Sequence, residues 1–150
     1  MESSYPLHIT KKISAWTRVV LILSLSLFFF ALPHTLEDFS LGEPAKNGVP
    51  APVLAFLVAG LFTLQGLALY WLGRDKRSSY FLHAGLGLAW SLAAGIEQFP
   101  VILASDSYRS GWISILYVAG MILIGLLLFG ASLQALRTTG ARAVRKNEHA

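Results

Sequence analysis

The sequence predicts an all-α membrane protein, a polytopic four-transmembrane-helix bundle with both termini in the cytoplasm. Three observations predict it: a shortage of charge, four long apolar runs, and basic residues gathered on one side of those runs. Of the 150 residues, 55% are hydrophobic and 13% are charged, whereas soluble domains carry about 25% charged residues. So little polar surface cannot coat a water-soluble domain. A chain of this length has room for one domain, so we treat residues 1–150 as a single integral membrane domain.

Each apolar run is long enough to cross a bilayer. About 20 residues of helix span a hydrocarbon layer of about 30 Å. We expect helices at about 13–36, 53–72, 79–104 and 112–136, and the second and fourth of these contain no charged residue. Lipid leaves only helices and closed barrels as spanning structures, and the runs lack the alternation of barrel strands. The four apolar runs are therefore predicted to be transmembrane helices.

The first run has a basic start and stays apolar from Val19 to Leu32, before Pro33 and His34 interrupt it. Its apolar stretch is longer than the 7–15 residues of a secretory signal, so we interpret it as a retained anchor. The connection to the second run, residues 42–52, contains Gly and Pro and is predicted to be irregular. Pro50 and Pro52 precede the second helix, where a missing N–H costs little.

In the third run, Glu97, Gln98 and Pro100 separate the apolar stretch that ends at Ile96 from a shorter apolar patch. The fourth run is uninterrupted. After it comes a tail, residues 137–150, rich in Thr, Gly, Ala and basic residues. We expect this tail to be loose or to lie against anionic lipid headgroups through its positive charge.

Basic residues determine the predicted orientation. Ten of the 12 Lys and Arg residues fall on one side of the membrane: Lys11, Lys12, Arg18, Arg74, Lys76, Arg77, Arg137, Arg142, Arg145 and Lys146. Only Lys46 and Arg109 fall on the other. Cytoplasmic loops carry the excess of Lys and Arg, so both termini and the 74–78 turn are predicted to be inside. We expect the cytoplasmic membrane of a prokaryote as the location. The net charge of +4 then reflects topology, and we expect no nucleic-acid partner.

Small residues predict where helices approach closely. Gly87, Ser91 and Gly95 recur at every fourth position of the third helix, and Ala55, Ala59 and Thr63 form a similar stripe on the second. We expect these two helices to pack tightly through their stripes, within one chain or between two. In the fourth helix, Gly120, Gly125 and Gly130 are five apart, which distributes them around the helix.

Polar residues that could carry chemistry gather at the outer ends of two helices. His34, Glu37 and Asp38 stand at i, i+3 and i+4 and share one face if the helix continues past Pro33. At about 1.5 Å per residue, the third helix brings Glu97 and Gln98 to a comparable depth. These five residues form our candidate ligand site at the outer face.

Three interpretations of this cluster remain open. The acidic residues can simply cap or end their helices at the interface. The cluster can hold the polar head of a quinone, a lipid or a small solute whose apolar body lies between helices. It can also bind a divalent ion or relay protons, although a single His-x-x-Glu pair lacks the second copy that di-metal bundles use. No metal site is assigned and no cofactor is identified.

At middle depth, Gln65, Trp90 and Tyr117 are candidates for the floor of a pocket beneath Glu97. The indole N–H of Trp90 needs an acceptor in lipid, and Gln65 or a backbone carbonyl could supply it. A haem held by two histidines is not expected, because His34 lies near the outer face whereas His8 and His83 lie near the inner face. The sequence contains no cysteine and no nucleotide-binding or hydrolase motif.

The architecture resembles that of several small membrane families, among them the DoxX-like proteins. No motif carries this resemblance, so it implies no residue assignments. We expect a binding module or an accessory subunit of a membrane assembly, whose partners are membrane lipids and another membrane protein or a second copy. A membrane-embedded enzyme that uses His34 as general base or ligand together with Glu37 and Glu97, or a small oligomeric transporter, is the alternative.

Overall fold

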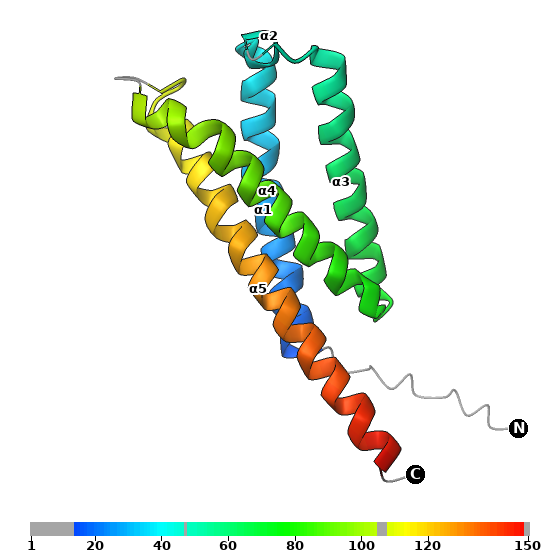
Figure 1. Ribbon diagram of the computed structural model, residues 1–150. Coiled ribbons are helices and arrows are strands. Elements are labelled where there is room, and N and C mark those ends of the chain that lie inside the picture. Colours follow the sequence, from blue (N-terminus) through cyan, green and yellow to red (C-terminus); the bar gives the residue numbers. More distant parts are fainter. Residues whose placement is uncertain (1–13, 47, 105–107, 149–150) are drawn as a thin grey trace, which may run out of the picture.

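A computed structural model describes residues 14–46, 48–104 and 108–148, with residues 104 and 140–148 described by their backbone alone. Its helices are α1 (Ala15–Ser40), α2 (Glu43–Lys46), α3 (Ala51–Gly73), α4 (Arg77–Ala104) and α5 (Trp112–Glu148) (Figure 1). These residues form no strand. The four long helices are long and apolar enough to cross a membrane. The chain is therefore a small multi-pass integral membrane protein, as the sequence predicted.

Helix α1 continues past Pro33 and ends at Ser40, beyond the predicted end at residue 36. It begins with a side-chain cap, because the Ser14 hydroxyl accepts a hydrogen bond of 3.1 Å from the Thr17 amide. Membrane helices tolerate an internal proline because neighbouring helices and nearby side chains satisfy the freed backbone groups. As a result, residues 34–38 are helical, and His34 and Asp38, which are four residues apart, share a buried face.

Two expectations outside the helix interiors need correction. The fourth helix does not end at residue 136, because α5 continues without a break to Glu148. The tail is therefore helical over residues 137–148, and its contact with anionic headgroups stays a prediction. Ala, Arg, Lys and Glu are good helix formers, and a helix that is already nucleated adds further residues at little cost. The outer connection is not wholly irregular either, since it contains the single helical turn of α2.

The helices differ in the extent of their contacts with one another. Helices α4 and α5 lie side by side over most of their length and make the most extensive contact, and α1 packs against α5 (Figure 1). Helix α3 touches only α4, α1 and α2 among the described elements. We call the end with α2 and the α4–α5 connection the outer end, following the predicted orientation, and the opposite end the inner end.

The predicted pairing of the two small-residue stripes is wrong. Gly87 and Ser91 of α4 face α5: a Cβ on Gly87 would lie 2.5 Å from the Gly125 carbonyl oxygen, and the Ser91 hydroxyl donates to the Ile122 carbonyl over 3.1 Å. Ala55 and Ala59 of α3 are exposed. The glycines of α5 do point in different directions, because Gly120 meets Phe30 whereas Gly125 meets Gly87.

Helix α3 is attached through its inner half. The Gln65 amide donates to the Ser24 carbonyl of α1 over 2.8 Å, and the Ser79 hydroxyl of α4 donates to the Ala68 carbonyl over 3.0 Å. Phe62 adds a ring contact to Trp90 at 5.2 Å between centroids. The outer half of α3 has no buried residue.

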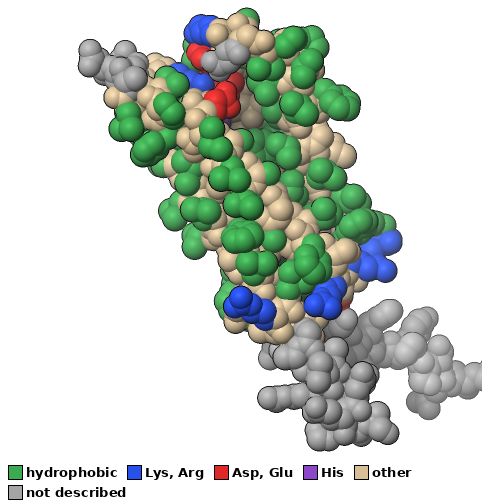
Figure 2. Space-filling model, viewed as in Figure 1, with side chains coloured by type: hydrophobic (Ala, Val, Ile, Leu, Met, Phe, Trp, Pro, Cys, Tyr) green, Lys and Arg blue, Asp and Glu red, His purple; other side chains and the backbone are tan. Residues whose placement is uncertain are grey.

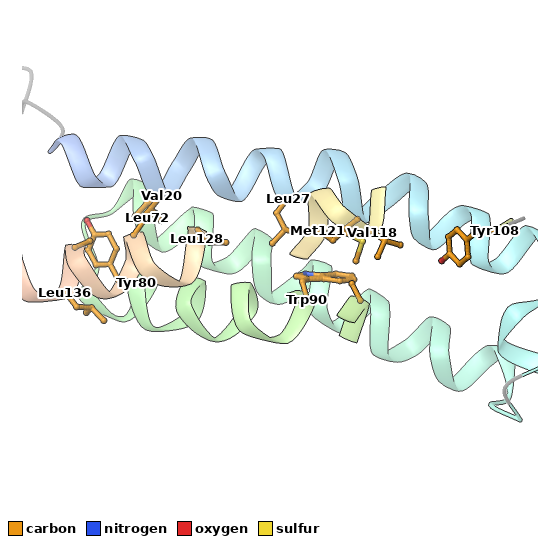
Figure 3. Close-up of a cluster of buried hydrophobic side chains, with 14 residues drawn as sticks. Val20, Leu27, Leu72, Tyr80, Trp90, Tyr108, Val118, Met121, Leu128 and Leu136 are labelled. Carbon is orange, nitrogen blue, oxygen red and sulfur yellow. The ribbon is translucent and has the colours of Figure 1, made fainter. Parts of the chain in front are cut away.

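The core follows the axis of the α1, α4 and α5 bundle. It extends from Tyr80 and Leu136 near the inner end, past Leu27 and Trp90, to Tyr108 near the outer end (Figure 3). Because this core is continuous, the three helices place their outer ends close together, and that is where the polar side chains meet.

Candidate ligand site at the outer end

The last turns of α1 bring His34 and Asp38 to the same buried face. The His34 Nε2 atom lies 3.6 Å from the Asp38 carboxylate, and the two residues are only 4% and 8% exposed. A carboxylate accepts hydrogen bonds, so we assign the imidazole proton to the nitrogen that faces it, Nε2. In the neutral imidazole this leaves Nδ1 as an acceptor.

The connection between α4 and α5 supplies a charge partner. The Arg109 guanidinium donates to the Asp38 carboxylate in an ion pair whose side chains are both largely buried. Arg109 adopts a backbone φ of 43°, in the left-handed region that non-glycine residues rarely occupy. Such strain persists where surrounding contacts hold it, and the ion pair with Asp38 provides that contact.

Glu37 is held by the start of α5. The Ser114 hydroxyl donates to its carboxylate over 2.5 Å, and the Ser110 amide donates to the Ser114 oxygen over 3.2 Å. The carboxylate therefore lies beside the N-terminal turn of α5, where the helix dipole favours negative charge. This contact joins α1 to α5 at the outer end.

Gln98 is held by Tyr108 on the same connection. The Tyr108 hydroxyl donates to the Gln98 side-chain oxygen over 2.6 Å, and the Arg109 guanidinium lies over the Tyr108 ring at 5.1 Å. Burial raises the pKa of Tyr108 to about 12, an effect that the positive charge of Arg109 opposes. The phenol therefore remains protonated at neutral pH and keeps its hydrogen to donate.

Three buried polar atoms of this cluster have no hydrogen-bond partner among the described residues: His34 Nδ1, Glu37 Oε2 and Gln98 Nε2. Buried polar groups are nearly always paired, and an unpaired one costs about 1–3 kcal/mol. In Glu37 and Gln98, the side-chain oxygen that is not among these three atoms accepts a hydrogen bond. In His34, the other ring nitrogen faces the Asp38 carboxylate. The cluster thus presents two acceptors and one donor in fixed positions.

The sequence grouped five residues here, and the structure brings four of them into contact networks. Glu97 is the exception, because its side chain is exposed and makes no hydrogen bond or ion pair within the described segments. Acidic and basic side chains are visible together near the outer end, above a band of apolar side chains (Figure 2). Glu97 therefore does not join the cluster in the described part of the chain.

The three residues predicted as a pocket floor share no hydrogen bond within the described part of the chain. Trp90 is buried, and its indole nitrogen has no partner within the described part of the chain. Gln65 does not accept from it, since the Gln65 amide is directed at Ser24 and its own oxygen has no partner there. Tyr117 is half-buried on α5. The suggested pairing of Trp90 with Gln65 is wrong because Gln65 instead joins α3 to α1.

Sequence reasoning missed three residues that hold the cluster in place: Arg109, Tyr108 and Ser114. One signal was available. Arg109 is one of two basic residues on the outer side, and buried carboxylates require a positive partner. Within the described segments, no group of three His, Cys, Asp or Glu side chains is arranged to hold a metal ion.

No family model, curated protein or solved structure matches the chain. Its function is therefore inferred from its own residues.

Proposed function

We propose that the protein is a membrane-embedded binding module, alone or as an accessory subunit of a membrane assembly, that takes the polar head of an amphiphile at its outer end. The observation that carries the proposal is the set of three buried, unpartnered atoms: His34 Nδ1, Glu37 Oε2 and Gln98 Nε2. A ligand head that pairs with them would offset their burial.

The chemistry of these atoms indicates the class of head. Two of them accept hydrogen bonds and one donates. The described charges of the cluster are the carboxylates of Glu37 and Asp38 and the guanidinium of Arg109, which leaves a net negative charge if His34 is neutral. A head with N–H or O–H donors, such as an ammonium or a hydroxyl group, fits this pattern better than a purely accepting head.

Two phospholipids that differ in their donors provide a test. We expect phosphatidylethanolamine, whose ammonium carries hydrogens, to raise the melting temperature of the protein in nanodiscs more than phosphatidylcholine does. The reason is mass action, since a ligand that binds only the folded state stabilises it. Tryptophan fluorescence during heating measures the transition.

Matched variants assign the effect to the site. Glu37→Gln should abolish the preference for phosphatidylethanolamine, because it replaces an anionic acceptor. Glu43→Gln should preserve the preference, because Glu43 lies at the same end but pairs with Lys46. Equal stabilisation of the wild-type protein by both lipids would refute the proposed head chemistry.

A second candidate function has one specific observation in its favour. The Asp38 carboxylate lies behind the His34 ring while Nδ1 has no described partner, which is how a general base is often oriented. An enzyme acting on the bound lipid would return chemically altered lipid from the same nanodiscs. A binding module returns it unchanged, and mass spectrometry of the recovered lipid separates the two.

A further inference from the structure

A second feature lies at the opposite end of the bundle, away from the outer cluster. An open groove of about 420 Å³ lies between the inner halves of α1 and α5. Trp16, Val19 and Leu23 of α1 form one side, and the α5 side includes Leu127 and Gly130. Its volume falls in the range of about 300–1,000 Å³ that is typical of small-molecule sites.

Gly130 explains why the groove exists. A Cβ built on this glycine would meet no atom within 4 Å among the described residues, so no other helix of the chain covers it. The larger side chains on both sides, Trp16 and Leu127, are exposed to the bilayer. An apolar groove open to lipid at this depth is filled by something flexible and apolar, and an acyl chain meets both conditions.

A positive charge lies where the head of such a lipid would be. Arg137 follows Gly130 by seven residues, which is two turns of helix and the same face of α5. The side chain of Arg137 is exposed, and it forms no ion pair within the described segments. Trp16 stands on the opposite side of the groove, near the start of α1, and tryptophan is enriched at the level of headgroups. Basic side chains are also visible at this inner end (Figure 2).

We propose that this groove binds one anionic phospholipid of the inner leaflet, with an acyl chain between α1 and α5 and its phosphate near Arg137. The charge of Arg137 favours an anionic lipid, because basic residues near a membrane surface attract anionic headgroups. This site is independent of the outer cluster.

Native mass spectrometry of the full-length protein, released from detergent with phosphatidylglycerol or phosphatidylcholine, tests the proposal. We expect one phosphatidylglycerol to be retained in preference to phosphatidylcholine. Arg137→Gln should weaken that binding about fivefold, the effect of one basic residue near an anionic surface. Gly130→Leu should remove the tight binding, because its side chain fills the groove.

Two control variants match these changes. Gly60→Leu alters another helical glycine with open space around it, and Arg77→Gln removes another exposed basic residue at the inner end. Both should retain phosphatidylglycerol as the wild-type protein does. Equal retention of both lipids, unchanged binding in Gly130→Leu, or a protein dimer that Gly130→Leu abolishes would each overturn the proposal.

Discussion

Arg109 and Asp38 show what a single buried charge pair does at the outer end. The pair joins the connection after α4 to the end of α1, and Asp38 also lies against His34. Removing one partner of a buried pair leaves the other charge uncompensated, which costs about 3–5 kcal/mol. The pair therefore orders the cluster as well as neutralising it.

We predict that Arg109→Gln strongly lowers the melting temperature of the protein in detergent, in line with that cost. Lys46→Gln removes the exposed pair with Glu43 and should change stability by less than about 1 kcal/mol. Adding Asp38→Asn to Arg109→Gln should restore part of the loss, because it removes the orphaned charge. If the two single variants melt alike, the Arg109 pair does not hold the outer end together.

Between elements, the backbones of α4 and α5 approach closely at Gly87 and Gly125. Their backbones come so close that a single added carbon on Gly87 would overlap the Gly125 carbonyl oxygen and the Phe129 amide nitrogen. Backbone atoms cannot move aside as a flexible side chain can. Small residues that let helix backbones approach are a common basis of packing within membranes.

For this contact we predict that Gly87→Ala destabilises the protein by about 1–3 kcal/mol, the usual cost of overpacking. Gly85→Ala is the matched control, since Gly85 lies on the same helix with no atom within 4 Å of an added Cβ among the described residues. It should be neutral or stabilising, because alanine favours helix over glycine. Thermal unfolding in detergent measures the melting temperature of each variant. Equal melting temperatures for Gly87→Ala and Gly85→Ala would contradict the close contact between α4 and α5.

Across the whole molecule, the two ends of the bundle differ in the charges that they carry. Basic side chains dominate the inner end, whereas the outer end mixes acidic and basic groups (Figure 2). Both proposals refer to a leaflet, so each relies on the orientation that the basic residues predict. Since the chain contains no cysteine, single introduced cysteines can report that orientation directly.

We predict that a cysteine at Lys46 reacts with a membrane-impermeant maleimide on intact cells. A cysteine at Ser78 should react only after permeabilisation, because it follows the basic turn at 74–77. Both positions are exposed, so access to the reagent depends on the side of the membrane. The opposite labelling pattern would reverse the orientation and place the outer cluster in the cytoplasmic leaflet.

For the candidate site, the sequence placed His34, Glu37, Asp38 and Gln98 at one depth because helical spacing and rise are local properties. It could not show that Glu97 stays exposed, because a side chain's direction on a helix matters only relative to its neighbours. Nor could it identify Arg109, Tyr108 and Ser114 as partners, since each contacts a residue on another element. Contacts such as Glu37 with Ser114 depend on how α1 meets α5.

By itself, the sequence determined that this is an all-α protein with four membrane-spanning helices, because the length and apolarity of a segment decide whether it can cross lipid. Only the tertiary structure decided that α4 pairs with α5 through Gly87, that α3 is attached by its inner half, and that α1 continues through Pro33. Helices in lipid have no hydrophobic force to select their partners, so pairing follows from the fit of small side chains and a few hydrogen bonds. That fit depends on the shapes of two surfaces at once, and no single stretch of sequence contains both.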